Sequence, residues 1–325
     1  WPSVLESFFV ALAGMVDTMM VSSIGAYAVA AVGLTTQPKF IGLALFIATN
    51  VSVSAIVARR RGEQDERGAN ETLLTALVFT ALAGIAVSAL SLYFADPIIH
   101  LCGSGPDTHE GAVLYFRIIM GGMIFNILSL VINAAQRGSG NTRIAMTTNV
   151  TSNLLNIVGN YLLIGGHFGF PALGIKGAAI ATVFGTVVAC VMSIASLLRK
   201  DSFVNIRTMV RDKVRLSLRP VKAIAKLSSS VFLEQLLMRA GFMSTAVMTA
   251  RLGTEAFAAH QAAMNILSIS FSFGDGMQVA AVALIGRSLG EKRPQLARLY
   301  GQICQRIGNV ISLAVSVFFL LGGRF

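Results

Sequence analysis

The segment GAAIATVFGTVVACVMSIASLL, residues 177–198, contains no charged side chain. A helix needs about 20 consecutive apolar residues to cross the hydrocarbon core of a bilayer. Three further blocks, residues 4–24, 40–58 and 72–95, have nearly the same length and character. Because backbone groups in hydrocarbon must be hydrogen-bonded within their own segment, each block is predicted to be a transmembrane helix.

The composition of the whole chain supports a membrane protein. Hydrophobic residues make up 54% of its 325 positions and charged residues 13%, with a mean hydropathy of +0.71. A soluble domain averages about 25% charged residues, so the polar surface is too small to cover a globule in water. We therefore predict an all-α, polytopic membrane protein. The expected helices lie near 3–24, 39–59, 71–95, 111–135, 144–164, 177–198, 227–250, 261–286 and 300–322.

The net charge of +11 follows the expected topology. Of the 26 basic residues, 19 lie in alternate loops, and the loops between them carry almost none. The positive-inside rule then places these loops and the N-terminus in the cytoplasm, with the helices in the plasma membrane. The charge therefore indicates orientation in a lipid membrane and no nucleic-acid partner. The four basic loops are 59–67, 137–143, 199–226 and 287–298.

The chain contains an internal repeat. Residues 1–97 align with residues 229–325 without a gap, at an offset of 228. The matched motifs are Leu-Glu at 5–6 and 233–234 and Arg-x-x-Gly-Glu at 59–63 and 287–291. Apolar bias alone does not produce such matches, and internal repeats are typical of transporters. Since the first copy contains six helices, both copies begin on the same side of the membrane.

This repeat predicts two six-helix bundles related by an axis along the membrane normal. Residues 1–199 form the first bundle, and residues 200–226 form a solvated, partly helical cytoplasmic connector. Residues 227–325 form the first three helices of the second bundle, so we expect the chain to be a fragment truncated after those three helices.

Four carboxylates lie in the parts of the predicted helices that cross the hydrocarbon: Glu6, Asp17, Glu234 and Asp275. A charge at the bilayer centre costs about 2.5–3.5 kcal/mol on insertion scales, so each is a candidate functional residue. Glu6 and Asp17 are eleven residues apart, which places them on one helix face about 16 Å apart. Asp17 is the deeper of the two and is predicted to be functional, whereas Glu6 is equally consistent with bonding near the interface. Arg239 is expected to form a buried ion pair with Asp275, and such pairs are often structural.

A row of asparagines, Asn149, Asn153, Asn156 and Asn160, follows one face of the fifth helix. Unpaired amides are unfavourable in lipid, so the row must face protein or water. Interhelical bonding, at about 0.6 kcal/mol per bond, is one explanation. Coordination of a small cation together with Asp17 is the other. Methionines of the seventh and eighth helices, such as Met238, suit a cavity for apolar shapes, although ordinary packing also accounts for them.

Four segments form a distinctive set: Val16-Asp17-Thr18, residues 136–143 (QRGSGNTR), residues 153–182 and residues 252–261. They resemble the multidrug and toxic compound extrusion (MATE) family of efflux transporters. The resemblance extends over the whole chain, and the block from Arg137 to Thr182 is specific.

The resemblance implies a cation or proton site at Asp17, Asn156, Asn160 and Thr182. Asn160 replaces the aspartate usual in the family, and the lost negative charge weakens the case for tight Na⁺ binding. In some members a glutamate matched by Glu234 acts with an aspartate of helix 10, which lies beyond residue 325. No metal other than this Na⁺ is expected.

The expected function is a monomeric secondary antiporter and no enzyme. It would export amphipathic, often cationic organic compounds in exchange for H⁺ or Na⁺ by alternating access, with no cofactor beyond the coupling ion. The expected substrate cavity is lined by Glu6, Asn153, Met238, Arg239 and Asp275.

Two alternatives belong to other classes. A flippase for lipid-linked oligosaccharides or peptidoglycan precursors would place several basic residues in the cavity, but few basic residues, Arg117 and Arg239 among them, lie in the predicted helices away from their ends. A membrane-embedded enzyme would need a metal cluster, paired catalytic carboxylates or a nucleophile motif, and the sequence shows none. Dye accumulation with and without an uncoupler distinguishes a coupled exporter from an enzyme.

Overall fold

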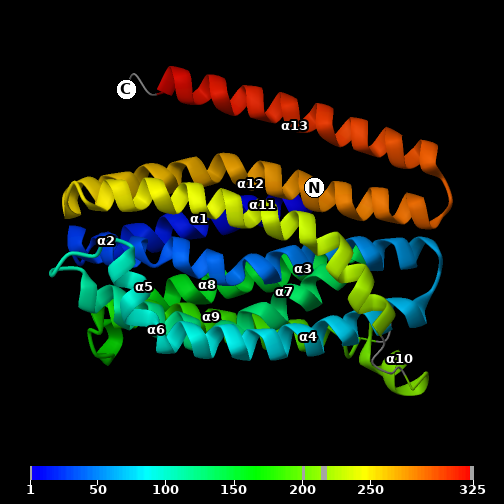
Figure 1. Ribbon diagram of the computed structural model, residues 1–325, viewed down its shortest axis with the longest axis horizontal. Helices are drawn as coiled ribbons and strands as arrows, with labels where there is room; N and C mark the ends of the chain where they lie inside the picture. The colour runs from blue at the N-terminus through cyan, green and yellow to red at the C-terminus, as the bar shows by residue number, and fades with distance from the viewer. Residues whose placement is uncertain (1, 200–201, 214–217, 323–325) are drawn as a thin grey trace.

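The computed structural model describes residues 2–199, 202–213 and 218–322, which form helices joined by short turns, with no strand among them (Figure 1). The elements are α1 (Pro2–Ser22), α2 (Ala26–Leu34), α3 (Thr36–Gly62), α4 (Glu66–Tyr93), α5 (Ala95–Leu101), α6 (His109–Gly121), α7 (Met123–Gly138), α8 (Thr142–Gly165), η1 (His167–Gly169), α9 (Gly174–Ser196), α10 (Ile206–Arg211), α11 (Leu218–Ala250), α12 (Thr254–Gly290) and α13 (Pro294–Gly322).

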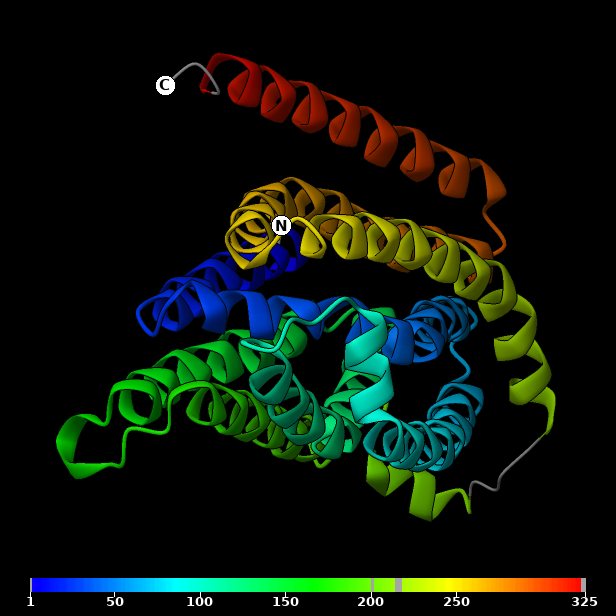
Figure 2. The same ribbon diagram turned by 60° about the vertical axis from the view of Figure 1, so that its left-hand side comes forward.

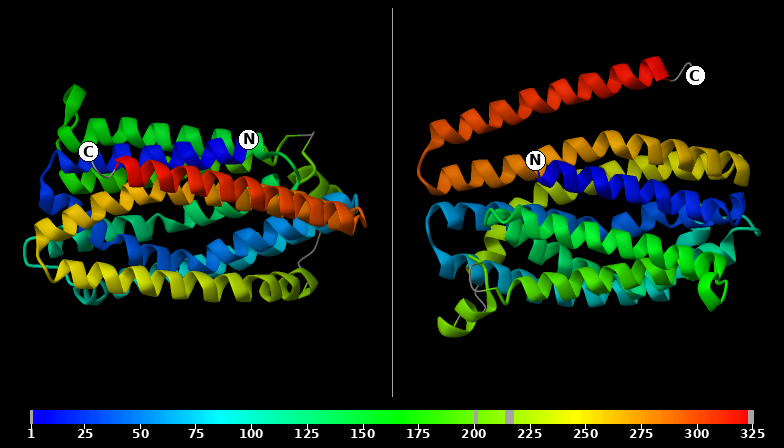
Figure 3. Two further views of the ribbon diagram at one scale, coloured as in Figure 1. Left: turned by 90° about the horizontal axis from the view of Figure 1, so that it is seen from above. Right: turned by 180° about the vertical axis from the view of Figure 1, so that it is seen from behind.

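The long helices lie side by side along one direction (Figures 1 and 3). By length and composition, four helical segments of the described chain can cross a membrane: Leu5–Ser22, Ala26–Gly62, Glu66–Tyr93 and Gly174–Ser196. They coincide with the four apolar blocks of the sequence to within two residues or include them, and the prediction of these blocks as membrane helices is confirmed. The pair α6 and α7, bent by 48°, forms a fifth span if counted as one. Among the described residues, the helices α8, α11, α12 and α13 do not pass this test of length and composition. In α8, for example, the row of asparagines lowers the mean hydropathy.

The span from Ala26 to Gly62 is broken between α2 and α3. Pro38 lies in the first turn of α3. It has no N–H to donate, and in a continuous helix its ring would clash with the carbonyl group of Leu34, four residues earlier. The Thr35 hydroxyl caps the break by donating to the carbonyl oxygen of Val32 at 2.7 Å. In the second copy of the repeat, Ile266 takes the place of Pro38, and α12 runs without a break.

The backbone repeats at the offset found in the sequence. The bounds of α12, 254–290, lie 228 residues after 26–62, the combined bounds of α2 and α3. Gly25 and Gly253, which precede these helices, both have positive φ, at 141° and 116°. The ion pair from Arg59 to Glu63 recurs between Arg287 and Glu291. The internal repeat is therefore a property of the fold.

The two copies meet at the end of the molecule that carries the basic loops. There, a Cβ atom on Gly62 would lie 2.2 Å from the carbonyl oxygen of Arg287. A Cβ atom on Gly290, the repeat mate of Gly62, would lie 2.1 Å from the carbonyl oxygen of Arg59. Only glycine fits such a crossing, and the reciprocal contact holds the ends of α3 and α12 together. Beyond this crossing, α13 packs against α12 and diverges from the rest (Figure 2).

The connector differs from the solvated linker expected for residues 200–226. Phe203 and Val204 are buried in a hydrophobic cluster with residues of α3, α4 and α7, and α10 packs against α4. The Asn205 side chain caps α10 by accepting from the Thr208 N–H at 2.7 Å. The last nine residues of the predicted connector, 218–226, belong to α11. Local apolar side chains and a cap therefore dock this segment despite its charge.

Candidate functional site

Two carboxylate–amide pairs join α1 to α8. Asn149 donates from Nδ2 to Glu6 Oε1, and Asn160 donates from Nδ2 to Asp17 Oδ1. Within each pair the two residues are 143 positions apart in sequence. Because this separation is the same in both pairs, α1 and α8 run parallel to each other. The pairs are three helical turns apart, about 16 Å along the axis. We name them the Glu6 rung and the Asp17 rung. Between them, Asn153 donates to the carbonyl oxygen of Asn149 within its own helix at 2.8 Å.

The Glu6 rung contains a buried ion pair. Arg137, in the last turn of α7, donates to Glu6 Oε1 at 2.9 Å, and the two side chains are only 9% and 8% exposed. From the sequence, Glu6 is expected to line the substrate cavity or to bond near the interface, and Arg137 is expected in a basic cytoplasmic loop. In the structure both side chains lie inside the first bundle, where removing one partner would leave a buried charge unpaired. This arrangement is that of a structural ion pair.

The Asp17 rung has no such counter-ion. Asp17 is half-buried and takes part in no ion pair within 4 Å among the described residues. Its partner Asn160 is fully buried, and within the described part of the chain Asn160 Oδ1 has no hydrogen-bond partner. A carboxylate beside an unused amide oxygen fits a small hard cation, which takes oxygen ligands, and it equally fits a proton on the carboxylate.

The other two predicted residues of this site lie beside the Asp17 rung. Asn156 donates to Thr182 Oγ1 at 3.1 Å, and the Thr182 hydroxyl donates to the carbonyl oxygen of Ala178 at 2.9 Å. Tyr115 of α6 is buried and lies within electrostatic reach of Asp17. The structure thus brings together all four residues expected from the resemblance and adds Tyr115, which the sequence analysis missed.

Lys39 is the second residue that the sequence analysis missed. This side chain of α3 is half-buried, and both Asp17 and Arg239 act on its charge. The helix predicted near 39–59 starts at this lysine, which places Lys39 at a helix end. Because the span begins at Ala26, Lys39 lies well inside it. The apolar stretch 26–34 was the signal that would have revealed this position.

The predicted residues of the second copy are more scattered. The Arg239 guanidinium lies over the Phe40 ring, 4.2 Å from its centroid. Arg239 and Asp275 act on each other electrostatically, but the ion pairs of the described residues do not include the expected pair between them. Asp275 and Glu234 are exposed, and Met238 is half-buried on α11. The structure therefore does not join these residues to the Asp17 rung.

Comparisons with known proteins match this chain to one family. The MatE family model matches residues 2–162 and 231–324. A probable multidrug resistance protein NorM of Thermotoga maritima is 26% identical over 319 residues, 97% of this chain and 66% of that protein. The uncharacterized transporter YisQ of Bacillus subtilis is 24% identical, over 90% of this chain and 64% of its own length. The chain thus spans about two thirds of the length of these relatives.

Solved structures agree with this match. An outward-facing structure of a multidrug resistance MATE family transporter of the MOP superfamily superposes with a TM-score of 0.85 and 26% identity. That alignment covers 99% of this chain and 70% of the other. The matched residues 2–162 contain both rungs in full. The chain is therefore a member of the MatE family of multi-pass membrane proteins, whose members are transporters and not enzymes.

Proposed function

We propose that the protein to which these helices belong is a secondary antiporter that exports amphipathic, often cationic organic compounds in exchange for H⁺ or Na⁺. The observation that carries this proposal is the Asp17 rung: a carboxylate at membrane depth that has an amide partner but, in the part of the chain that the structure describes, no cation within ion-pairing distance. Such a group gains most from binding a coupling ion, because charged side chains in a membrane need compensation.

The position of α1 supports coupling between this rung and the second copy. One side of α1 packs against α8, and another packs against α12. Phe8 of α1 contacts Phe273 of α12, with ring centroids 6.0 Å apart. An ion at Asp17 changes the α1–α8 contact, and α1 carries this change to α12. A ligand shifts a conformational equilibrium only by its differential affinity for the two states, so the α1–α8 contact must differ between them.

The Gly62–Gly290 crossing supports alternating access. It closes the basic end of the molecule, which the positive-inside rule places in the cytoplasm together with the N-terminus. If this crossing separated, the expected substrate cavity would open toward the cytoplasm. While the crossing is closed, the cavity would be accessible only from the outside. In this proposal the antiporter acts as a monomer in the plasma membrane. The substrate and the coupling ion bind to it alternately.

Dye accumulation in cells that express the full-length protein tests the proposal. Wild-type protein should lower the accumulation of a cationic dye, and an uncoupler should abolish the difference. Asp17→Asn should return accumulation to the level of the empty vector at equal amounts in the membrane. Asp212→Asn, which changes a carboxylate at the surface, is the matched control and should behave as wild type. Efflux that persists in Asp17→Asn would remove this carboxylate from the mechanism.

One observation favours the flippase alternative. Such a protein needs several cations around the pyrophosphate of its cargo, and Lys39 joins Arg239 at the Phe40 ring between the two copies. Lys39→Met distinguishes the two functions, because loss of this ammonium group should abolish flipping of an anionic cargo but spare the export of a cationic dye. Flipping of a fluorescent lipid-linked pyrophosphate by reconstituted protein is the measurement.

A further inference from the structure

A cavity of about 320 Å³ lies at the basic end of the first bundle, away from the Asp17 rung. It is formed where the docked connector meets the end of α3 and the start of α4. Three of its lining side chains are arginines and one is a carboxylate. The lining residues are Arg61, Glu66, Ser202, Phe203, Asn205, Arg207, Thr208 and Arg211.

Buried hydrogen bonds hold the walls of this cavity in place. Asn70 of α4 is fully buried, donates to the carbonyl oxygen of Phe203 at 3.2 Å, and accepts from the Asn205 N–H at 3.0 Å. Ser202 donates to Gln136 Oε1 of α7 at 3.0 Å. Asn70 and Ser202 thus fix the connector to two different helices. The cavity is therefore a preformed feature of the fold.

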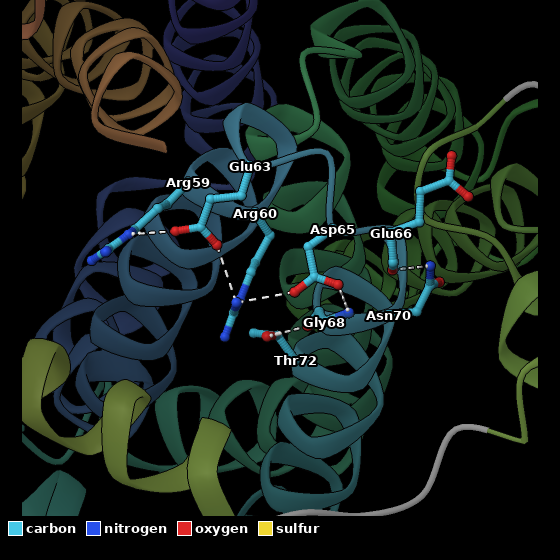
Figure 4. A network of polar contacts seen from close by, with 8 residues as sticks. All are labelled: Arg59, Arg60, Glu63, Asp65, Glu66, Gly68, Asn70 and Thr72. Carbon is cyan, nitrogen blue, oxygen red and sulfur yellow. Dashed lines mark hydrogen bonds and ion pairs between the residues drawn. The ribbon is translucent and has the colours of Figure 1, made fainter. Parts of the chain in front are cut away.

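Neighbouring carboxylates leave two of the arginines free. Arg59 and Arg60, next to the cavity, are bound to Glu63 and Asp65, whereas the Glu66 carboxylate points away from this network (Figure 4). Arg211 pairs with Asp212 at 2.8 Å. The remaining two, Arg61 and Arg207, form no ion pair within 4 Å among the described residues. Arg61 is held over the Phe203 ring, 4.5 Å from its centroid, which orients its guanidinium group.

The surroundings of the cavity place it at the membrane surface. The segment α10 lies at the edge of the helix bundle, beside the start of the membrane span of α4 (Figures 1 and 3). Two apolar side chains of this region have large exposed fractions: Val210 within α10, at 72%, and Leu198, just after the end of the span of α9, at 66%. Exposed apolar groups beside arginines at the end of a span are suited to the boundary between acyl chains and headgroups.

We propose that this cavity binds the phosphate group of an anionic phospholipid headgroup in the leaflet next to the basic loops. Planar guanidinium groups bind phosphate oxygens through paired, charge-assisted hydrogen bonds. Basic pockets beside transmembrane helices are suited to anionic headgroups. Arg61 and Arg207 hold the phosphate, and Leu198 and Val210 contact the first part of the acyl chains. A lipid bound here fixes the connector between the two copies of the repeat.

Lipid titration of the purified full-length protein tests this site. Delipidated protein in detergent is titrated with short-chain phosphatidylglycerol, and phosphatidylcholine serves as the neutral probe. The double variant Arg61→Gln/Arg207→Gln should bind phosphatidylglycerol roughly thirtyfold more weakly, from the loss of two cations near the surface. Binding of phosphatidylcholine should not change.

The matched control is Arg293→Gln/Arg298→Gln, which removes the same charge from the same end of the molecule. It should retain wild-type affinity, and equal weakening in both double variants would show a diffuse charge effect and overturn the site. Arg207→Lys keeps the charge but loses the planar fork, and we expect intermediate affinity with an unchanged unfolding temperature. Full competition by millimolar inorganic phosphate would identify a soluble phosphate as the ligand and overturn the assignment to a lipid.

Discussion

The Glu6 rung and the Asp17 rung are built from the same parts and differ in one. Each joins a carboxylate of α1 to an asparagine of α8 at the same sequence separation. In the Glu6 rung, Arg137 supplies a buried counter-ion at 2.9 Å. The Asp17 rung has no cation within ion-pairing distance among the described residues, and Lys39 acts on it only from farther away.

This difference separates a structural carboxylate from a candidate coupling carboxylate. A carboxylate whose charge is already compensated has little to gain from binding another cation. A carboxylate that lacks compensation binds a proton or Na⁺ more readily, because the ion removes an unfavourable charge. Depth in the membrane already favoured Asp17 over Glu6 in the sequence, and the counter-ion of Glu6 adds an independent physical reason.

The largest effect on stability is expected from Arg137→Met. It leaves Glu6 buried with an uncompensated charge, at a cost of about 3–5 kcal/mol. Thermal unfolding in detergent should show a large fall in Tm, and the double variant Glu6→Gln/Arg137→Met should recover most of it. Asp17→Asn, which removes a charge that has no close counter-ion, is the control and should shift Tm little. Equal losses in Arg137→Met and Asp17→Asn would show that the two rungs do not differ in this way.

Asn160→Asp should have the next largest effect. A second carboxylate at hydrogen-bonding distance from Asp17 adds a negative charge to the Asp17 rung, and we expect Na⁺ affinity to rise by about ten- to a hundredfold. Calorimetric titration of the purified protein with NaCl, with choline chloride as the ionic-strength control, measures the change. The equivalent change in the Glu6 rung, Asn149→Asp, should raise Na⁺ affinity much less, because Arg137 leaves that rung with one net negative charge, whereas the Asp17 rung would carry two.

Removal of the Lys39 charge should also strengthen cation binding at Asp17, but by a smaller factor than Asn160→Asp. In Lys39→Met the long-range repulsion of an incoming cation is lost, which corresponds to about a tenfold gain in Na⁺ affinity. Arg117→Met also removes a basic group from a helix interior and is the matched control. If both variants changed Na⁺ affinity alike, Lys39 would have no specific relation to the Asp17 rung.

Asn153→Ala should have the smallest effect. Asn153 lies between the rungs, yet its amide donates to a carbonyl of its own helix. We expect a change in stability within about 0.5 kcal/mol and wild-type efflux. Asn149→Ala, which removes a hydrogen bond to a buried carboxylate, should cost about 1.5–3 kcal/mol. An equal loss of stability in both alanine variants would contradict the claim that Asn149 binds a buried carboxylate and Asn153 does not.

The sequence predicted the membrane helices from local composition, and it predicted the repeat from motifs that match at a single offset. It was less accurate for helix ends, since hydropathy marks the hydrocarbon-crossing part and not the helix that continues beyond it. The helix α12 begins at Thr254 and not near 261, and α11 begins at Leu218 and not near 227. The same limitation hid Lys39, whose span was expected to begin at residue 39.

The sequence also predicted the components of the Asp17 rung but not its contrast with the Glu6 rung. The equal eleven-residue spacing of Glu6 and Asp17 and of Asn149 and Asn160 was a usable signal for two parallel, paired helices. Nothing in the spacing shows that Arg137, next to a basic loop, turns inward to Glu6. That contact depends on how α7 packs beside α1 and α8, which is a property of the tertiary structure.

Ion flux during dye export most directly tests the contrast between the two rungs. Full-length protein is reconstituted in proteoliposomes, and uptake of H⁺ or Na⁺ is recorded while a cationic dye is released. We predict that Glu6→Gln/Arg137→Met, which keeps the first bundle uncharged at the Glu6 rung, retains ion flux coupled to the dye. Asp17→Asn should lose it while remaining folded. Coupled flux that survives in Asp17→Asn, or that disappears in the folded Glu6→Gln/Arg137→Met protein, would contradict this account.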